Sequence, residues 1–293
     1  MGRYHAQKLA RLPGVQLVAA VDADLSRAQA LGVSAFSDYR AIFGKAEVAV
    51  IAVPTDRHYD IARDCLEHGL HLLIEKPIAT TLAQADELIA LAESRKLVLQ
   101  SGHVERYNRA FGALLARMDR PVFVESERLA GFKTRGAEVD VVLDLMIHDL
   151  DLACALARAE PVGVSACGFR VLTRDIDIAN ARIEFANGCV ANLSASRVSQ
   201  APVRKLRVFQ PDLYVSADLR AGKLRYVREA AGVIAETDET YEGGDALADQ
   251  AAAFAAAVAG RERVRIDGRE GRRALELALT VGRLVRERLE KFA

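Results

Sequence analysis

The stretch His71-Leu72-Leu73-Ile74-Glu75-Lys76-Pro77 combines a short apolar run with an abrupt end. A run of this length is typical of a strand that helices cover on both faces. Pro77 disfavours helical geometry at Lys76 and cannot continue a strand, so the strand should end beside Glu75. In a doubly wound sheet, residues just beyond the carboxyl ends of the strands face the ligand-binding crevice. The stretch therefore predicts a parallel sheet with Lys76 directed toward a bound ligand.

The same alternation of short apolar runs and helical segments extends over residues 1–108. Helix punctuation agrees with it, because Thr81 is a candidate N-cap residue and Gly69 a candidate C-cap residue. Strands alternating with helices predict an α/β domain with a Rossmann-type, doubly wound parallel sheet and helices on both faces. The predicted strands cover residues 16–21, 48–53, 71–74 and 97–100, and the predicted helices cover residues 4–12, 25–31, 56–68 and 82–94, with a helical turn centred on Ile42.

Beyond residue 108 the pattern changes, and we place a second domain at residues 109–293. Runs with strand character dominate its middle part, and Asn187-Gly188 between two of them is a strong hairpin signal. Grouped strands with segregated helices predict an α+β domain whose open sheet is mostly antiparallel. The predicted strands cover residues 121–129, 162–172, 179–185, 190–196, 204–210, 214–217 and 224–228, and the predicted helices cover residues 109–118, 141–158, 246–259 and 268–292.

The composition is that of a folded globular chain, with 51% hydrophobic and 27% charged residues among 293. The 40 basic and 40 acidic residues balance, which gives no electrostatic reason to expect nucleic acid or an anionic membrane as a partner. No apolar run reaches membrane-spanning length, and the N-terminus lacks a signal-peptide pattern. We expect a cytoplasmic protein with reduced thiols and no structural zinc, because four cysteines lie far apart without a CxxC motif: Cys65, Cys154, Cys167 and Cys189.

The chain begins with a helix where a dinucleotide-binding unit would begin with a strand and a glycine-rich turn. Gly2 takes the place of the third glycine of that turn, and Asp22 follows the second strand at the usual spacing. A carboxylate there can bind an adenosine ribose, which favours NAD, although an Asp after a strand is also a common turn residue. Arg27 could instead meet the 2′-phosphate of NADP. We expect the sheet to lack its first strand, a longer natural form to exist, and this chain to bind cofactor weakly; NAD binding in the micromolar range would contradict this.

Lys76 is the first candidate catalytic residue. A lysine facing the crevice can orient a substrate hydroxyl, or accept its proton if burial lowers the pKa of the ammonium group. The alternative is a solvated lysine that precedes a turn. The position after a buried strand and before Pro77 favours the functional interpretation.

Asp144 and His148 are the second candidate pair, because they lie four residues apart on one face of the predicted helix 141–158. A carboxylate beside an imidazole fixes its tautomer and raises its basicity, which suits the pair to take a proton from an alcohol. Alternatively, Asp144 complements the helix dipole and His148 is structural. A metal site formed with Glu138 and Asp151 is conceivable, but no HExxH motif or cysteine cluster supports it, and we expect no metal.

In combination, these motifs resemble the Gfo/Idh/MocA family of nicotinamide-dependent oxidoreductases, and the resemblance extends from Met1 to Phe292. In that family the lysine of the Glu-Lys-Pro motif and an Asp and a His of a helix in the second domain surround the substrate carbon. The resemblance implies that Lys76, Asp144 and His148 form the catalytic set, with His148 as the base and Lys76 also contacting substrate and ribose. It further implies an NAD site formed by Gly2, Asp22, Val53, Pro54, Thr55, His58, Glu75 and Lys76.

A finer resemblance concerns the substrate. Residues 102–108, 125–129 and 140–149 are similar to family members that oxidise the 3-hydroxyl of UDP-N-acetylglucosamine. Arg106 and Arg128, with Lys133 and Arg135, could meet a diphosphate, since arginine suits bidentate contacts; surface arginines in loops are the alternative. Tyr107 and Phe132 could stack on a base, but we expect them to pack in the core.

The sequence is also compatible with two other functions. One is oxidation of inositol, another polyol or a free aldose. The other is a non-catalytic binding protein with a degraded Rossmann domain. The family resemblance also implies a homodimer or a homotetramer, with substrate bound over Lys76 and His148.

Overall fold

The computed structural model describes residues 1–132, 139–230 and 232–291. The chain divides into two compact units. The first comprises residues 1–104 and 245–275, and the second comprises residues 105–244 and 276–293. The division expected from the sequence, at residue 108, assigned the whole segment 245–275 to the second domain, whereas this segment packs with the first unit.

Long-range contacts explain this difference. Helix α7 (Ala246–Val258) lies against α1 (Gly2–Leu9), and the Lys8 ammonium group lies 2.5 Å from the Asp245 carboxylate at the start of α7. Farther on, the backbone N–H of Ser101 donates to the carbonyl of Ile266 at 2.9 Å. Contacts between such distant segments leave no local pattern in the sequence from which they could be predicted.

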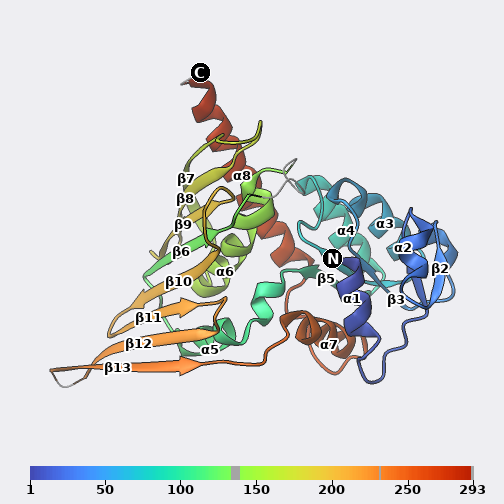
Figure 1. The fold of residues 1–293 in the computed structure, drawn as a ribbon, viewed down its shortest axis with the longest axis horizontal. Coiled ribbons are helices and arrows are strands. Elements are labelled where there is room, and N and C mark those ends of the chain that lie inside the picture. The colour runs from blue at the N-terminus through green and yellow to red at the C-terminus, as the bar shows by residue number, and fades with distance from the viewer. Residues whose placement is uncertain (133–138, 231, 292–293) are drawn as a thin grey trace. The chain divides into compact units, whose positions relative to one another are not determined.

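The first unit contains parallel strands in two separate sheets (Figure 1). Strands β3 (Val48–Ile51), β4 (His71–Glu75) and β5 (Leu99–Gly102) form one sheet in that order, and β1 (Ala19–Val21) pairs with β2 (Ser34–Phe36) in the other. No described strand joins β1 to β3, and α1 is the first element of the chain, as we expected. Helices α3 (His58–Glu67) and α4 (Leu82–Ser94) pack together on one side of β3–β5, while α1 and α7 pack together on the other.

Local signals set the ends of these elements. Thr81 accepts a hydrogen bond from the Gln84 backbone N–H and Gln84 bonds back to the Thr81 N–H, which completes a capping box at the start of α4. Gly69 has φ +81° after α3, as its predicted place at the helix end requires. Strand β1 is shorter than predicted because only residues 19–21 find a partner, in β2. The short β2 and helix α2 (Leu25–Gln29) complete this region.

The second unit is built on an eight-stranded sheet with the order β13-β12-β11-β10-β6-β9-β8-β7. Strands β6 and β9 run parallel and all other neighbours are antiparallel, which confirms the predicted mostly antiparallel sheet. The strands are β6 (Phe123–Leu129), β7 (Pro161–Phe169), β8 (Ile178–Phe185), β9 (Val190–Ser196), β10 (Val203–Gln210), β11 (Leu213–Asp218), β12 (Lys223–Ala230) and β13 (Val233–Thr240).

Helices cover one face of this sheet (Figure 1). Buried and more exposed residues alternate along β6, β8 and β11, so each strand turns one side toward α5 (Arg109–Arg117), α6 (Ile147–Ala157) or the later part of α8 (Gly268–Lys291). A Cβ atom on Gly168 of β7 would lie 2.9 Å from a methyl carbon of Val285, so α8 packs closely on that strand. The Asn187-Gly188 hairpin joins β8 to β9, with φ +85° at Gly188, as predicted.

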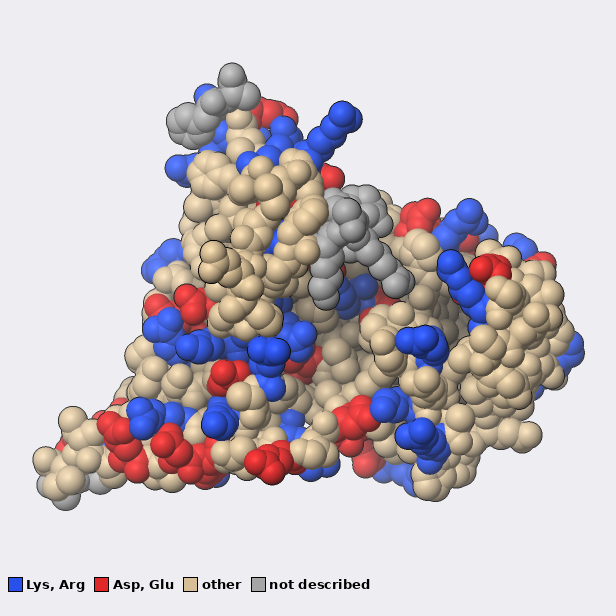
Figure 2. Space-filling view, in the orientation of Figure 1, with Lys and Arg blue, Asp and Glu red and all other residues tan. Residues whose placement is uncertain are grey.

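Most predicted elements therefore occur, with ends shifted by at most three residues. Strands β2 and β13 were not predicted, and Phe292, the predicted end of the last helix, lies outside the described residues. Acidic and basic side chains are interspersed over the face of the molecule shown in Figure 2. Within the described ranges, every helix is too short or too polar to cross a membrane.

Candidate functional site

In the first unit, β4 ends at Glu75, and the following peptide bond, Lys76–Pro77, is cis. Gly102 at the end of β5 lies directly against this point. A Cβ atom there would stand 2.7 Å from the Glu75 Cα and 3.0 Å from the Ile74 carbonyl oxygen, so only glycine permits so close an approach. The predicted strand end is confirmed, and Lys76 follows it as a half-buried side chain.

Glu75 is buried and its carboxylate has a partner that the sequence did not suggest. The Nε2 atom of His5, on α1, lies 2.6 Å from Glu75 Oε1 and both residues are almost fully buried. We expected Glu75 to contact the cofactor; in the structure its Oε1 lies against the His5 ring nitrogen, and this contact links α1 to the end of β4. The two residues are 70 positions apart, so no local signal predicts this pair.

His58 joins the loops that follow β3 and β4. Its Nδ1 lies 2.8 Å from the Pro77 carbonyl oxygen and its Nε2 lies 3.0 Å from the Val53 carbonyl oxygen. Burial lowers the pKa of His58, although both backbone carbonyl groups oppose this. A neutral imidazole has only one N–H group, so it donates to one carbonyl at a time. Through this buried side chain the backbone after β3 is held against the backbone after β4.

The other predicted cofactor residues lie near the strand ends or at the start of α1. Asp22 follows β1, is half-buried, and accepts a hydrogen bond from the Asp24 backbone N–H at 2.9 Å. Val53 and Pro54 are exposed after β3, and Thr55 is half-buried at the start of the 3-10 helix Thr55–Arg57. Gly2 is exposed, and a Cβ atom there would meet nothing within 4 Å.

These positions fit a dinucleotide. Ligands of parallel α/β sheets bind beyond the carboxyl ends of the strands, and Asp22, Val53, Lys76 and Gly102 stand at or just beyond four such ends. A half-buried carboxylate after β1 is suited to ribose hydroxyl groups. The tight packing of Gly102 on Glu75 keeps two of these strand ends together.

In the second unit, Asp144 and His148 lie on one continuous helical segment, and both are half-buried. The predicted helix 141–158 is present, but its first part, Val142–Met146, is π-helical, and regular α-helix begins at Ile147. A four-residue spacing places Asp144 and His148 on one face only where the segment is regular α-helix. In a π-helical turn the backbone bonds close at i+5, so the two side chains are offset differently from the prediction; such turns are frequent at functional sites.

Asp140 anchors the start of this segment. Its Oδ1 accepts hydrogen bonds from the backbone N–H groups of Val142 and Leu143 at 3.1 and 3.0 Å. Its Oδ2 lies 3.2 Å from Nη1 of Arg286, which projects from α8. A carboxylate at the first free N–H groups of a helix is stabilising, and this one is paired as well.

Arg128, expected to bind a substrate diphosphate, is 4% exposed and bonded within the protein. Its Nε donates to Asp149 Oδ2 at 2.6 Å, its Nη2 to Asp149 Oδ1 at 3.2 Å, and its Nη1 to Glu105 Oε1 at 3.1 Å. The attraction of Asp149 and Glu105 outweighs burial and raises the pKa of Arg128. The bidentate edge of the guanidinium group thus holds Asp149, the residue after His148.

The remaining candidates divide between the core, the surface and the segment outside the described residues. Arg106 is partly buried and its Nη1 donates to Asp151 Oδ1 at 3.2 Å. Tyr107 is buried, as expected, whereas Phe132 is exposed. Lys133, Arg135 and Glu138 fall outside the described residues. Among the residues that are described, no three His, Cys, Asp or Glu side chains are placed to hold a metal ion.

Comparison with known families matches both parts of the chain. Residues 1–103 match an oxidoreductase family with an NAD-binding Rossmann fold, and residues 116–211 match the GFO/IDH/MocA C-terminal domain. The UDP-N-acetylglucosamine 3-dehydrogenase of Acidithiobacillus ferrooxidans is 39% identical over an alignment of 292 positions, which covers 96% of this chain and 93% of that protein. A solved structure of that dehydrogenase superposes with a TM-score of 0.92, covering 97% of this chain and 93% of the other.

More distant relatives include inositol dehydrogenases. A scyllo-inositol 2-dehydrogenase (NAD(+)) of Bacillus subtilis is 29% identical over 223 residues, covering 68% of this chain and 65% of that protein. The structure of an inositol dehydrogenase homologue from Azotobacter vinelandii, complexed with NADH and myo-inositol, has a TM-score of 0.85 at 18% identity, and covers 97% of this chain and 92% of its own. At that identity the similarity concerns the fold alone.

Proposed function

Because the chain belongs to the Gfo/Idh/MocA family of NAD-binding oxidoreductases, we propose that it is a dehydrogenase that oxidises the 3-hydroxyl of UDP-N-acetylglucosamine. The observation that carries the proposal is the 39% identity to a relative of that activity over nearly the whole of both chains. Lys76, Asp144 and His148 provide the ammonium, carboxylate and imidazole groups to which the proposal assigns the chemistry.

Each catalytic side chain has a proposed part. His148 accepts the proton of the sugar hydroxyl as the carbon–oxygen bond gains double-bond character, and Asp144 stabilises the resulting imidazolium. Lys76 holds the oxygen in position with its ammonium group. When bound, NAD supplies the hydride acceptor for the oxidation. The removal of one proton and one hydride leaves a ketone on the sugar.

For the cofactor, we propose that Asp22 binds the adenosine ribose and that Val53, Pro54 and Thr55 line the dinucleotide, with Gly2 near the start of the site. A carboxylate at Asp22 favours NAD, because the 2′-phosphate of NADP would be repelled. Glu75 and His58 act by holding the loops after β3 and β4, given that each is buried and bonded to protein groups.

For the substrate diphosphate, Arg106 stays a candidate, while Arg128 supports Asp149 and thereby the helix of His148. A second candidate function, oxidation of an inositol, is favoured by the 29% identity to a scyllo-inositol dehydrogenase. By family resemblance we also propose a cytoplasmic homodimer or homotetramer, which analytical ultracentrifugation would test.

A substrate panel tests the proposed function. The purified chain is incubated with NAD and, separately, UDP-N-acetylglucosamine, N-acetylglucosamine, scyllo-inositol and myo-inositol, and NADH formation is followed by absorbance. We expect kcat/KM to be highest for the nucleotide sugar. A higher value for either inositol would replace the proposal with the second candidate, and no turnover of any of them at saturating NAD would reject both.

A further inference from the structure

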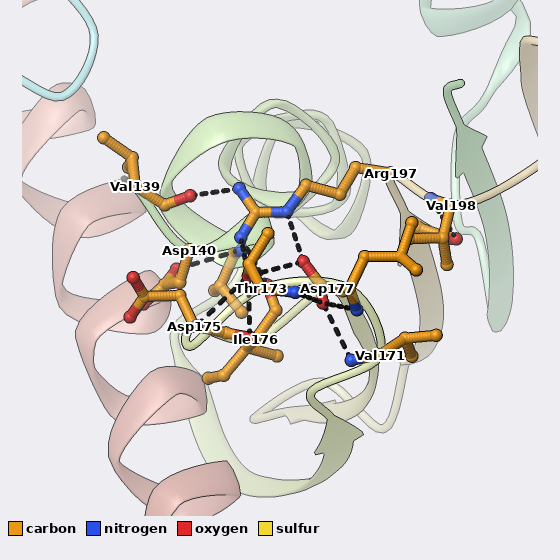
Figure 3. Close-up of polar contacts among 12 residues, drawn as sticks. Val139, Asp140, Val171, Thr173, Asp175, Ile176, Asp177, Arg197 and Val198 are labelled. Atoms are coloured by element: carbon orange, nitrogen blue, oxygen red, sulfur yellow. Dashed lines mark hydrogen bonds and ion pairs between the residues drawn. The ribbon is translucent and has the colours of Figure 1, made fainter. Parts of the chain in front are cut away.

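The loop between β7 and β8 is built around a buried ion pair. Asp177 is fully buried and Arg197, at the end of β9, is 5% exposed. Arg197 Nε donates to Asp177 Oδ1 at 2.8 Å. Asp177 Oδ2 accepts hydrogen bonds from three consecutive backbone N–H groups, those of Val171, Leu172 and Thr173, at 2.7, 2.7 and 2.8 Å. Figure 3 shows the two side chains at the centre of this network.

The guanidinium group of Arg197 reaches beyond this loop. Its Nη2 donates to the Ile176 carbonyl at 3.2 Å, and its Nη1 donates to the carbonyl of Val139 (Figure 3). The Ile176 carbonyl in turn accepts the backbone N–H of Val141 at 2.9 Å. The ion pair therefore holds the backbone at residues 139 and 141, on both sides of Asp140.

Asp140 is the residue that anchors the π-helical turn. Since its Oδ1 takes the backbone N–H groups of Val142 and Leu143, the place of Asp140 fixes where the turn begins. Asp144 lies in that turn and its backbone N–H donates to the Asp140 carbonyl at 3.0 Å. A displacement of Asp140 would thus be transmitted to Asp144 and to the following turn with His148.

The network is well suited to this task because its charges and donors are satisfied internally. Burial alone would raise the pKa of Asp177, but the three backbone N–H groups and Arg197 hold it well below its usual value. Lysine at position 197 would keep the charge but could not donate to Asp177, Ile176 and Val139 from one planar group. The shape of the guanidinium, as well as its charge, is required.

We infer that Asp177 and Arg197 are positioning residues that set the start of the helical segment carrying Asp144 and His148. The catalytic consequence of this inference rests on the proposed function. All of the contacts lie within the second unit, so cofactor binding by the residues of the first unit should not depend on them.

Two variants and a control test this inference. Arg197→Lys removes the fork, and Thr173→Val removes the hydroxyl that donates to Asp177 at 2.8 Å and accepts from Arg197 at 3.2 Å, a milder change that keeps the shape of the side chain. Val215→Ala is the control, because it removes buried methyl groups from β11 of the same unit, away from this network.

Hydrogen exchange gives a result that needs no activity. We expect the amides of residues 141–147 to exchange at least about tenfold faster in Arg197→Lys than in the wild type, with a smaller increase in Thr173→Val. We expect no such increase in Val215→Ala when the variants are compared at equal thermal stability. Unchanged exchange at these amides in a folded variant would overturn the inference. Should Arg197→Lys fail to fold, Thr173→Val decides the question by the same measurement.

Steady-state kinetics then test the catalytic consequence. We expect kcat of Arg197→Lys to fall about tenfold to a hundredfold, as misplacement of reacting groups can cause, with NAD affinity unchanged. A loss of NAD affinity equal to that of kcat would indicate general damage and overturn the positioning role. If the wild-type chain turns over no nucleotide sugar, the proposed function fails, while the exchange measurement still decides whether the ion pair sets the helix start.

Discussion

Replacing Arg128 by methionine separates a structural role from a substrate-binding role for this residue. Methionine retains most of the aliphatic stem but removes the charge and all three hydrogen bonds to Asp149 and Glu105. Each of the two carboxylates would keep a different hydrogen-bond partner. Glu105 keeps the Arg204 guanidinium at 2.9 Å, and Asp149 keeps the Ser126 hydroxyl at 2.8 Å.

The magnitude follows from these remaining partners. Removing one member of a buried ion pair costs about 3–5 kcal/mol, and the residual contacts place this variant near the lower end, at about 3 kcal/mol. For a unit of this size, that corresponds to a fall in Tm of roughly 6–12 °C. Arg204→Met is the matched control. Arg204 contacts the same Glu105, but its side chain is 49% exposed, so the expected loss of stability is only about 0–1 kcal/mol.

The assay is calorimetric unfolding of both variants and of the double variant Arg128→Met/Asp149→Leu. Because an apolar pair can replace a buried ion pair at little cost, the double variant should be more stable than Arg128→Met alone. A structural role for Arg128 is excluded if Arg128→Met melts within the range of Arg204→Met and instead raises KM for the nucleotide sugar. Arg128 would then be a substrate contact, as the sequence first suggested.

Two further predictions concern backbone packing and pH. Gly102→Ala places a methyl group against the Glu75 backbone, so it should lower the free energy of unfolding by about 1–3 kcal/mol and weaken NAD binding. Gly112→Ala lies in open space on α5 and should be neutral or stabilising in thermal unfolding. Equal effects of the two substitutions would contradict the close packing at Gly102. The pKa of Asp177 is lowered in the folded state, so its ionised form stabilises the fold above the unfolded pKa of about 3.9, and this contribution is lost as pH falls further. The difference in Tm between wild type and Asp177→Asn should therefore shrink as pH is lowered from about 6 toward 3; a constant difference would exclude the carboxylate charge as its cause.

Local chemistry in the sequence was sufficient for a large part of the fold. Pro77 predicted the end of β4, Thr81 and Gly69 predicted helix ends, and Asn187-Gly188 predicted the hairpin. Each of these residues affects the backbone only within a few positions along the chain, so its effect can be inferred without knowledge of the rest of the sequence. Strand β13 was missed because its residues are mostly exposed and mix charged with apolar side chains, which leaves no alternation.

Contacts between distant segments could not be predicted from the sequence. The partners of Glu75, Arg128 and Asp177 come from segments that only folding brings together. Arg128 shows the consequence most clearly, since an arginine in a strand has the same local signature whether it meets a phosphate or a buried carboxylate. The π-helical turn at Asp144 was also hidden, because an apolar helical pattern does not distinguish it from regular α-helix.

Oxidation at C3 transfers the hydrogen of that carbon to NAD, so an isotope at C3 follows the reaction. UDP-N-acetylglucosamine deuterated at C3 is incubated with NAD and the chain, and the NADH formed is analysed by mass spectrometry. The account predicts one deuterium in each NADH, with a rate lowered about a hundredfold or more in His148→Ala and in Lys76→Ala. Unlabelled NADH would contradict oxidation at C3, and an undiminished rate in both variants would contradict the assigned catalytic residues.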